Sequence, residues 1–190
     1  MVNTPAANTV VTGTHGDLDT RSSPTPPAQH RTVTHLIRAD TAAVFALVTD
    51  VVATSAYSEE LIEVVWTRRQ HRDLVTVGDQ FTSRNSLAGM TWTATSTVTA
   101  ADPGRRFAFA VNGPEHPTAT WTFKLLPAAR RGHTDVAYTV ELGDGPTMFD
   151  TFTAGDPALR PAAETHRLDA LAADMAKLLA ELDNRCRETP

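Results

Sequence analysis

Six short segments between residues 62 and 140 alternate apolar and polar side chains, and this alternation constrains the fold more than any other feature. A period of two is the pattern of a β-strand with one buried and one solvent-exposed face. Turn signals such as Asp102-Pro103-Gly104 separate the segments, so the pattern predicts an antiparallel sheet. The buried face is expected to carry, strand by strand, Ile62, Val64 and Trp66; Phe81, Ser83, Asn85 and Leu87; Trp92, Ala94, Ser96 and Val98; Phe107, Phe109 and Val111; Ala119, Trp121, Phe123 and Leu125; and Val136, Tyr138 and Val140.

The period changes to that of a helix at the C-terminal end of the chain. Apolar residues recur there at spacings of three and four, at Leu168, Leu171, Ala172, Met175, Leu179 and Leu182. Pro161 is tolerated only in a first helical turn, which predicts a helix from 161 to 186, about 39 Å long. Near the other end, residues 32–38 read as a strand, and Asp40 is placed to cap a helix that presents Val44 and Val48 on one face.

These elements together predict an α+β domain. A second short helix is expected between residues 50 and 61. A curved antiparallel sheet of six to seven strands would wrap around the long C-terminal helix, with the two short helices beside it. Residues 1–31 are rich in Thr, Pro, Ala and Ser and show no period, which predicts a disordered N-terminal tail before a single domain at 32–187.

Charge and composition exclude several classes of function. Lys and Arg number 17 against 22 Asp and Glu, a net charge of −5 that argues against a nucleic-acid partner. The single Cys186 excludes an internal disulfide and a multi-cysteine metal site. No apolar run reaches the roughly 18–20 residues of a membrane span, and the first residues lack the pattern of a secretory signal. We therefore expect a cytoplasmic protein without membrane contact, metal or cofactor.

Three stretches of the chain resemble one known family. They are TAAVFALVTDVVATSAYSEEL at 41–61, VGDQFTSRNSLAGMTWTATSTVTAADPGRRFAFAV at 77–111, and TATWTFKLLPAARRGHTDVAYTVEL at 118–142. Over residues 32–185 the chain is similar to the bacterial polyketide cyclase/dehydrase group of the START-like, Bet v 1-like (SRPBCC) superfamily. The resemblance implies a helix-grip fold with a deep apolar cavity between the sheet and the long helix. The superfamily includes polyketide aromatases and cyclases, lipid carriers and hormone-binding proteins.

Small residues on the buried face of the strands suggest that this cavity has room for a ligand. Ser83, Ala94, Ser96 and Ala119 cannot fill the space that Leu or Ile would occupy there. The alternative is that the C-terminal helix simply packs closer to the sheet.

Aromatic residues share the same phase and predict the walls of the cavity. Trp66, Trp92 and Trp121, with Phe81 and Tyr138, could stack against a planar polycyclic molecule and hydrogen-bond its oxygens. Ordinary core packing is the alternative for each of them.

Polar residues supply the candidate chemistry. Asn85 carries an amide inward and needs a partner, from the protein or from a ligand. Glu164 extends the apolar stripe of the last helix, where a partly desolvated carboxylate could move protons, although acidic residues also favour a first helical turn for electrostatic reasons alone. Tyr57 falls where this fold has its cavity mouth. Arg84 points outward by parity, whereas some cyclases of the family use an inward arginine.

The resemblance implies a small-molecule enzyme of secondary metabolism, such as a lyase of antibiotic biosynthesis that cyclises and dehydrates a hydrophobic poly-ketone chain. Asn85, Tyr138 and Glu164 are the predicted catalytic residues. The predicted substrate-binding residues are Tyr57, Trp66, Phe81, Ser83, Trp92, Ser96 and Trp121. A non-catalytic carrier of a hydrophobic metabolite, and a module that works through its surface, are the alternatives. We expect a monomer or homodimer whose partner is a hydrophobic small molecule.

Overall fold

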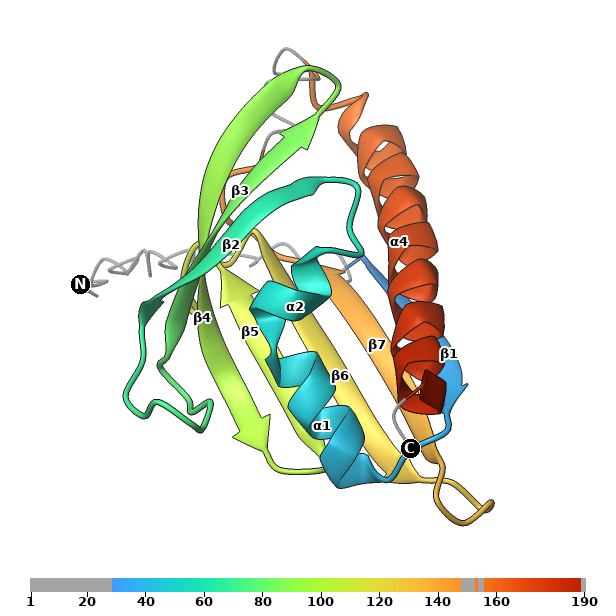
Figure 1. Ribbon diagram of the computed structural model, residues 1–190. Helices are drawn as coiled ribbons and strands as arrows, with labels where there is room; N and C mark the ends of the chain where they lie inside the picture. The colour runs from blue at the N-terminus through green and yellow to red at the C-terminus, as the bar shows by residue number, and fades with distance from the viewer. Residues whose placement is uncertain (1–28, 148–152, 154–155, 189–190) are drawn as a thin grey trace, which may run out of the picture.

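A seven-stranded antiparallel sheet, in the order β1-β7-β6-β5-β4-β3-β2, forms the body of the molecule (Figure 1). The computed structural model describes residues 29–147, 153 and 156–188. The strands are β1 (His30–Ile37), β2 (Leu61–Arg68), β3 (Gln80–Leu87), β4 (Met90–Asp102), β5 (Arg106–Val111), β6 (Ala119–Pro127) and β7 (Thr134–Leu142). The expectation of six to seven antiparallel strands is confirmed.

The first strand completes the sheet by returning to the last one. β1 pairs antiparallel with β7, with His30 opposite Glu141 and Ile37 opposite Thr134. It begins at His30, two residues before the predicted boundary at 32. The predicted disordered tail falls largely on residues 1–28, which lie outside the described residues.

A β-bulge near the start of β2 changes which side chains face inward. Leu61 pairs with Asn85 and Glu63 pairs with Arg84, so the register shifts by one residue between these two pairs. The prediction that Ile62 faces inward is therefore wrong: its side chain is 48% exposed, while Leu61 takes the inward place. A two-residue period read from sequence cannot detect the extra residue of a bulge.

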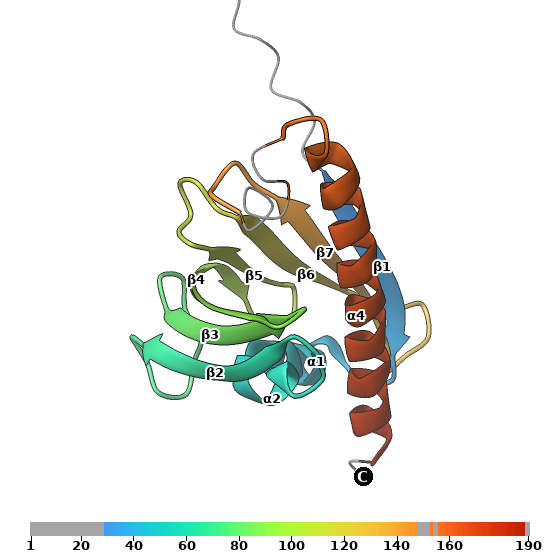
Figure 2. The same ribbon diagram turned by 90° about the horizontal axis from the view of Figure 1, so that it is seen from above.

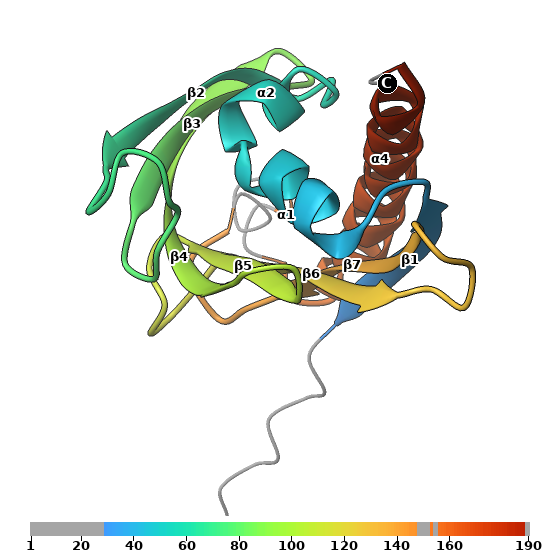
Figure 3. The same ribbon diagram turned by 60° about the horizontal axis from the view of Figure 1, so that its bottom comes forward.

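Two short helices follow β1. Asp40 caps α1 (Thr41–Thr49) by accepting a hydrogen bond from the backbone N–H of Ala43 at 2.8 Å, as predicted. Asp50 caps α2 (Val51–Ser55) in the same way. Helix α1 packs against β5 and β6, and α2 packs against β2. Both helices therefore lie within the curve of the sheet (Figure 3).

The long C-terminal helix α4 (Arg160–Glu188) contains the predicted stripe and packs against β1 and β7 (Figure 2). Leu168, Leu179 and Leu182 are fully buried in this contact. Near the end of the helix, the buried carboxylate of Asp183 accepts hydrogen bonds from the backbone N–H of Arg38 at 3.0 Å and from its guanidinium. This anchor ties α4 to the residue that follows β1, and the helix-grip arrangement is confirmed.

Candidate functional site

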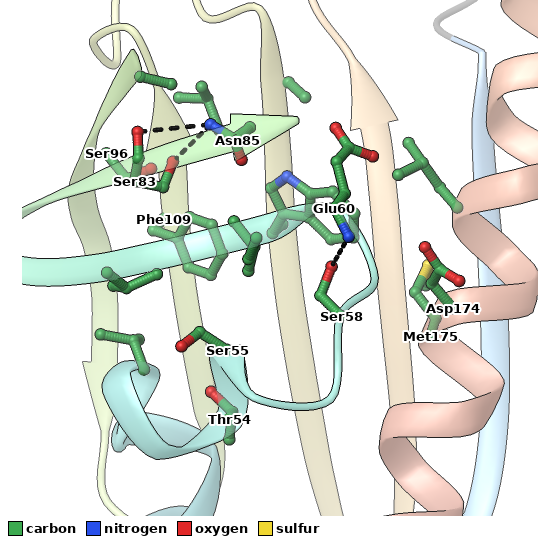
Figure 4. Close-up of a pocket in the computed structure, with 18 of the residues that line it drawn as sticks. Thr54, Ser55, Ser58, Glu60, Ser83, Asn85, Ser96, Phe109, Asp174 and Met175 are labelled. Carbon is green, nitrogen blue, oxygen red and sulfur yellow. Dashed lines mark hydrogen bonds between the residues drawn. The ribbon is translucent and has the colours of Figure 1, made fainter. Parts of the chain in front are cut away.

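A cavity of about 300 Å³ lies between the concave face of the sheet, the α1–α2 region and one flank of α4 (Figure 4). Strands β3 to β7 provide the largest share of its lining, and residues 48–64, α4 and two loop threonines, Thr118 and Thr147, provide the rest. The lining is predominantly apolar, with a few polar side chains, which is the usual composition of a small-molecule site.

A continuous row of aromatic rings forms one wall of the cavity. The ring of Phe81 on β3 lies 5.1 Å from that of Phe109 on β5, which stacks on Trp121 of β6 at 6.4 Å between ring centroids. Trp121 in turn lies 5.4 Å from Tyr138 of β7, and Tyr138 stacks on Phe123 at 3.7 Å. All five rings line the cavity, and such a wall is suited to contact with an aromatic ligand.

A polar cluster of buried side chains lies on β3 and β4. The Nδ2 atom of Asn85 donates a hydrogen bond to the Oγ of Ser83 at 3.1 Å, so the amide is oriented from within its own strand (Figure 4). The side-chain Oδ1 of Asn85 and the hydroxyl of Ser96 have no hydrogen-bond partner among the described residues. Both residues line the cavity. An acceptor and a hydroxyl are therefore left for a molecule inside it.

Tyr138 adds a third polar group to the cavity. Its ring is buried in the aromatic row, and its hydroxyl makes no hydrogen bond with the described part of the chain. Burial raises the pKa of Tyr138 far above its usual value, because a desolvated phenolate is unfavourable. The phenol stays protonated at physiological pH, so it is suited to donate a hydrogen bond and unsuited to act as a base.

Three charged residues line the cavity beside α4. Arg167 donates from its Nη2 atom to both carboxylate oxygens of Glu60, at 2.6 and 2.7 Å. The third charged residue is Asp174. It lies on α4, as Arg167 does, whereas Glu60 lies on the loop before β2 at the other side of the cavity (Figure 4). None of these was predicted from the sequence. For Arg167 and Asp174 the available signal was their position on the helix, since Arg167, Asp174 and Leu178 follow the edge of the apolar stripe at spacings of seven and four. Glu60 lies in the loop before β2, where no periodic pattern marks it.

Most of the predicted site residues line this cavity. They are Tyr57, Phe81, Ser83, Asn85, Trp92, Ser96, Trp121 and Tyr138. Ala94 and Ala119, which were expected to leave room for a ligand, also line it. Arg84 is exposed and lies 3.7 Å from Glu63, in agreement with its outward parity.

Two predicted residues lie elsewhere. Trp66 packs edge-on against Phe81, and the guanidinium of Arg69 lies 4.5 Å from its ring centre, so it supports the wall from behind. Glu164 accepts hydrogen bonds from Arg160 at 2.7 Å and from Gln29 at 2.8 Å and is not part of the lining.

The position of Glu164 has a simple geometric cause. Leu171 and Met175 of the apolar stripe line the cavity, together with the neighbouring flank of the helix at Arg167, Asp174 and Leu178. Arg167 is the first lining residue of α4, so Glu164 lies nearer the start of the helix than the part that borders the cavity. Its carboxylate is bonded there to Arg160 and Gln29.

Neither a metal-binding cluster nor a membrane-spanning helix is present in the described part of the chain. Residues 29–147, 153 and 156–188 contain no group of three or more His, Cys, Asp or Glu side chains arranged to hold a metal ion. Within these residues, no helix combines the length and the apolarity that a membrane crossing requires.

The curved sheet, the long helix and the apolar cavity between them define a protein of the helix-grip fold. The chain belongs to the family described as polyketide cyclase/dehydrase and lipid transport, whose model matches residues 28–185.

Solved structures with the same fold include a polyketide cyclase-like protein, Cgl2372, from Corynebacterium glutamicum. It is 24% identical, with a TM-score of 0.57 over 84% of this chain and 91% of the other. The Zhui aromatase/cyclase from Streptomyces sp. R1128 is 17% identical, with a TM-score of 0.59 over 83% and 95%. The two-domain aromatase/cyclase StfQ of steffimycin biosynthesis is 13% identical, with a TM-score of 0.65 over 85% of this chain and 51% of its own. A comparison with curated proteins gives no match.

Proposed function

We propose that this protein encloses a hydrophobic, oxygen-bearing small molecule and cyclises it, by holding a poly-ketone chain in the one conformation that favours a single ring closure. The observation that carries the proposal is a set of polar groups on buried, cavity-lining residues that have no hydrogen-bond partner within the described part of the chain: the Oδ1 of Asn85 and the hydroxyls of Ser96 and Tyr138. Buried polar groups are nearly always hydrogen-bonded, so these three are suited to partners supplied by a ligand.

The main contribution to the rate would be positioning. Tyr138 donates a hydrogen bond to a carbonyl oxygen and stabilises the negative charge that develops there during attack. Asn85 accepts a hydrogen bond from an enol hydroxyl, and the aromatic row holds the intervening carbons flat. The family to which the chain belongs and the aromatase/cyclases that share its fold support this assignment.

The proton transfers require one base in the cavity. Asp174 takes a proton from a methylene carbon between two carbonyls, and the resulting carbanion forms a carbon–carbon bond with a second carbonyl carbon. The oxygen of that carbonyl takes up a proton to become a hydroxyl. The hydroxyl then leaves with a hydrogen from the adjacent carbon, as water, and a double bond forms. Glu164 has no role in this scheme, because it is bonded to Arg160 and Gln29 outside the cavity.

A non-catalytic carrier is the second candidate, and one observation favours it. The raised pKa of Tyr138 keeps the phenol from acting as a base, and Glu60 is engaged by Arg167. Asp174 is then the one remaining carboxylate among the described lining residues. A carrier would use the same cavity and the same hydrogen-bonding groups without needing a proton acceptor.

The test is to incubate the purified protein with a synthetic poly-β-ketone thioester and to follow ring products by mass spectrometry. We expect faster formation of one product, a loss of at least about tenfold in turnover for Asp174→Asn, and an affinity that stays within about threefold. Asp169→Asn, an exposed position on the same helix that pairs with Arg31, is the matched control and should retain turnover. Unchanged product distribution with intact binding would assign the protein to the carriers.

Ala94→Leu provides the complementary variant, because Ala94 is buried in the cavity wall and a larger side chain there occupies ligand space. It should abolish both binding and turnover while the protein stays folded. Retention of binding in this variant would contradict the cavity as the site.

A further inference from the structure

The cavity is lined by one ion pair, between Arg167 and Glu60, and by one further carboxylate, that of Asp174. The guanidinium of Arg167 and the carboxylate of Glu60 are 23% and 11% exposed, so this ion pair is largely withdrawn from water. In Figure 4, Glu60 projects from the loop before β2 and Asp174 from α4, and both side chains lie between these elements. Among the described lining residues the charges sum to −1.

Arg167 keeps hydrogen-bonding capacity after pairing with Glu60. Both contacts to Glu60 come from Nη2, and no described residue accepts from its Nε or Nη1. A guanidinium has five N–H donors in a fixed plane, so three remain for another acceptor. Lys177 does not line the cavity; it lies 2.7 Å from Glu59 and 3.7 Å from Asp174, so it pairs with these two carboxylates from outside the cavity.

We propose that Glu60 is a built-in counter-anion that makes the cavity selective for uncharged ligands. This inference rests on the proposed function and names the class of molecule that the site accepts: aromatic or poly-ketone compounds with a carbonyl oxygen, and no carboxylate, at the α4 end. A carbonyl accepts from the remaining donors of Arg167 without disturbing the ion pair. A carboxylate would have to displace Glu60, leaving that charge withdrawn from water and unpaired, with Asp174 nearby.

Two fluorescent dyes with the same ring system provide the test. N-phenyl-1-naphthylamine is uncharged, and 8-anilino-1-naphthalenesulfonate carries an additional sulfonate. The measured quantity is the ratio of their dissociation constants, because the ratio cancels changes in cavity shape. In Glu60→Gln the affinity for the sulfonate should rise about tenfold, while that for the uncharged dye changes less than about threefold.

Glu59→Gln is the matched control for this variant. It makes the same chemical change one residue earlier, removes the same net charge, and affects a side chain that is 81% exposed and outside the lining. Its dye ratio should equal that of the unaltered protein. An equal shift in both variants would show a general charge effect and would overturn the inference.

Arg167→Gln extends the test in the opposite direction. It leaves the carboxylate of Glu60 without its positive partner, so the sulfonate should bind about tenfold more weakly. The double variant with Glu60→Gln removes the whole pair and should restore the original ratio. Unchanged ratios in all of these variants would overturn the inference and leave the proposed function standing. Failure of the unaltered protein to bind either dye, or binding that persists in Ala94→Leu, would instead contradict the proposed function itself.

Discussion

The two faces of helix α4 differ in what they contribute to the molecule. One face, at Leu168, Leu179 and Leu182, is fully buried against β1 and β7. The flank at Arg167 and Asp174 borders the cavity and is only partly buried. A helix can therefore border a cavity on one face when another of its faces packs against the sheet. Stability and ligand recognition are thereby separated on a single element.

The residues that anchor the helix and those that border the cavity also lie at different ends of α4. Asp183, which Arg38 anchors, lies near the C-terminal end, whereas Arg167 lies near the N-terminal end. The sheet curls away from α4 toward β2 (Figure 2). Glu60, in the loop before β2, reaches Arg167 on the flank of α4 through its carboxylate. Variants on the packed face should therefore lower mainly stability, and variants on the flank should weaken mainly binding.

The largest expected effect is on the packed face. Leu179→Ala removes a fully buried side chain from the contact with the sheet and should lower the free energy of unfolding by about 2–5 kcal/mol. Urea denaturation followed by circular dichroism measures this change.

Leu178→Ala is the matched control, because it makes the same truncation one residue away on the cavity side. Part of its surroundings is already empty space, so it should cost less than about 2 kcal/mol and should weaken the binding of the uncharged dye. Equal losses of stability in the two variants would contradict the division of α4 into two faces.

The next effect concerns the anchor at Asp183 and depends on pH. Hydrogen bonds from Arg38 lower the pKa of Asp183 to about 2, against roughly 3.9 in an unfolded chain. The ionised carboxylate therefore stabilises the fold fully above about pH 4, and this stabilisation is lost as the pH falls toward 2. Asp183→Asn should lower the free energy of unfolding by about 1–2 kcal/mol at neutral pH.

The diagnostic quantity is the difference in unfolding free energy between the unaltered protein and Asp183→Asn. It should shrink as urea denaturation is repeated at pH 6, 4 and 2.5, because other carboxylates contribute equally to both proteins. A difference that stays constant over this range would show that Asp183 contributes through shape rather than through its charge.

The elements of the fold could be predicted from the sequence because they depend on local periodicity. Alternation located the strands, and the spacing of Leu168, Leu179 and Leu182 located the buried face of α4. Local signals failed at Ile62, because a bulge depends on how two strands pair rather than on either strand alone.

The cavity was predictable on the strand side and unpredictable on the helix side. Ser83 and Ser96 line it because strand parity determines which residues share a face. A helix, in contrast, has several faces, and only the arrangement of the sheet decides which of them borders an empty space. Arg167 and Glu60 are separated by 107 residues along the chain, so no local pattern could pair them.

The smallest expected effect concerns Glu164, the residue that sequence reasoning placed in the cavity. Its carboxylate is bonded to Arg160, four residues earlier on α4, and to Gln29, and it does not line the cavity. Because an ion pair of this i,i+4 type is usually worth less than about 1 kcal/mol, Glu164→Gln should change stability only slightly. Turnover and both dye affinities should stay within about twofold of the unaltered protein, whereas Asp174→Asn loses turnover. A loss of turnover in Glu164→Gln comparable to that in Asp174→Asn would mean that the first turns of α4 also face the ligand, and the assignment of Asp174 as the base would fail with it.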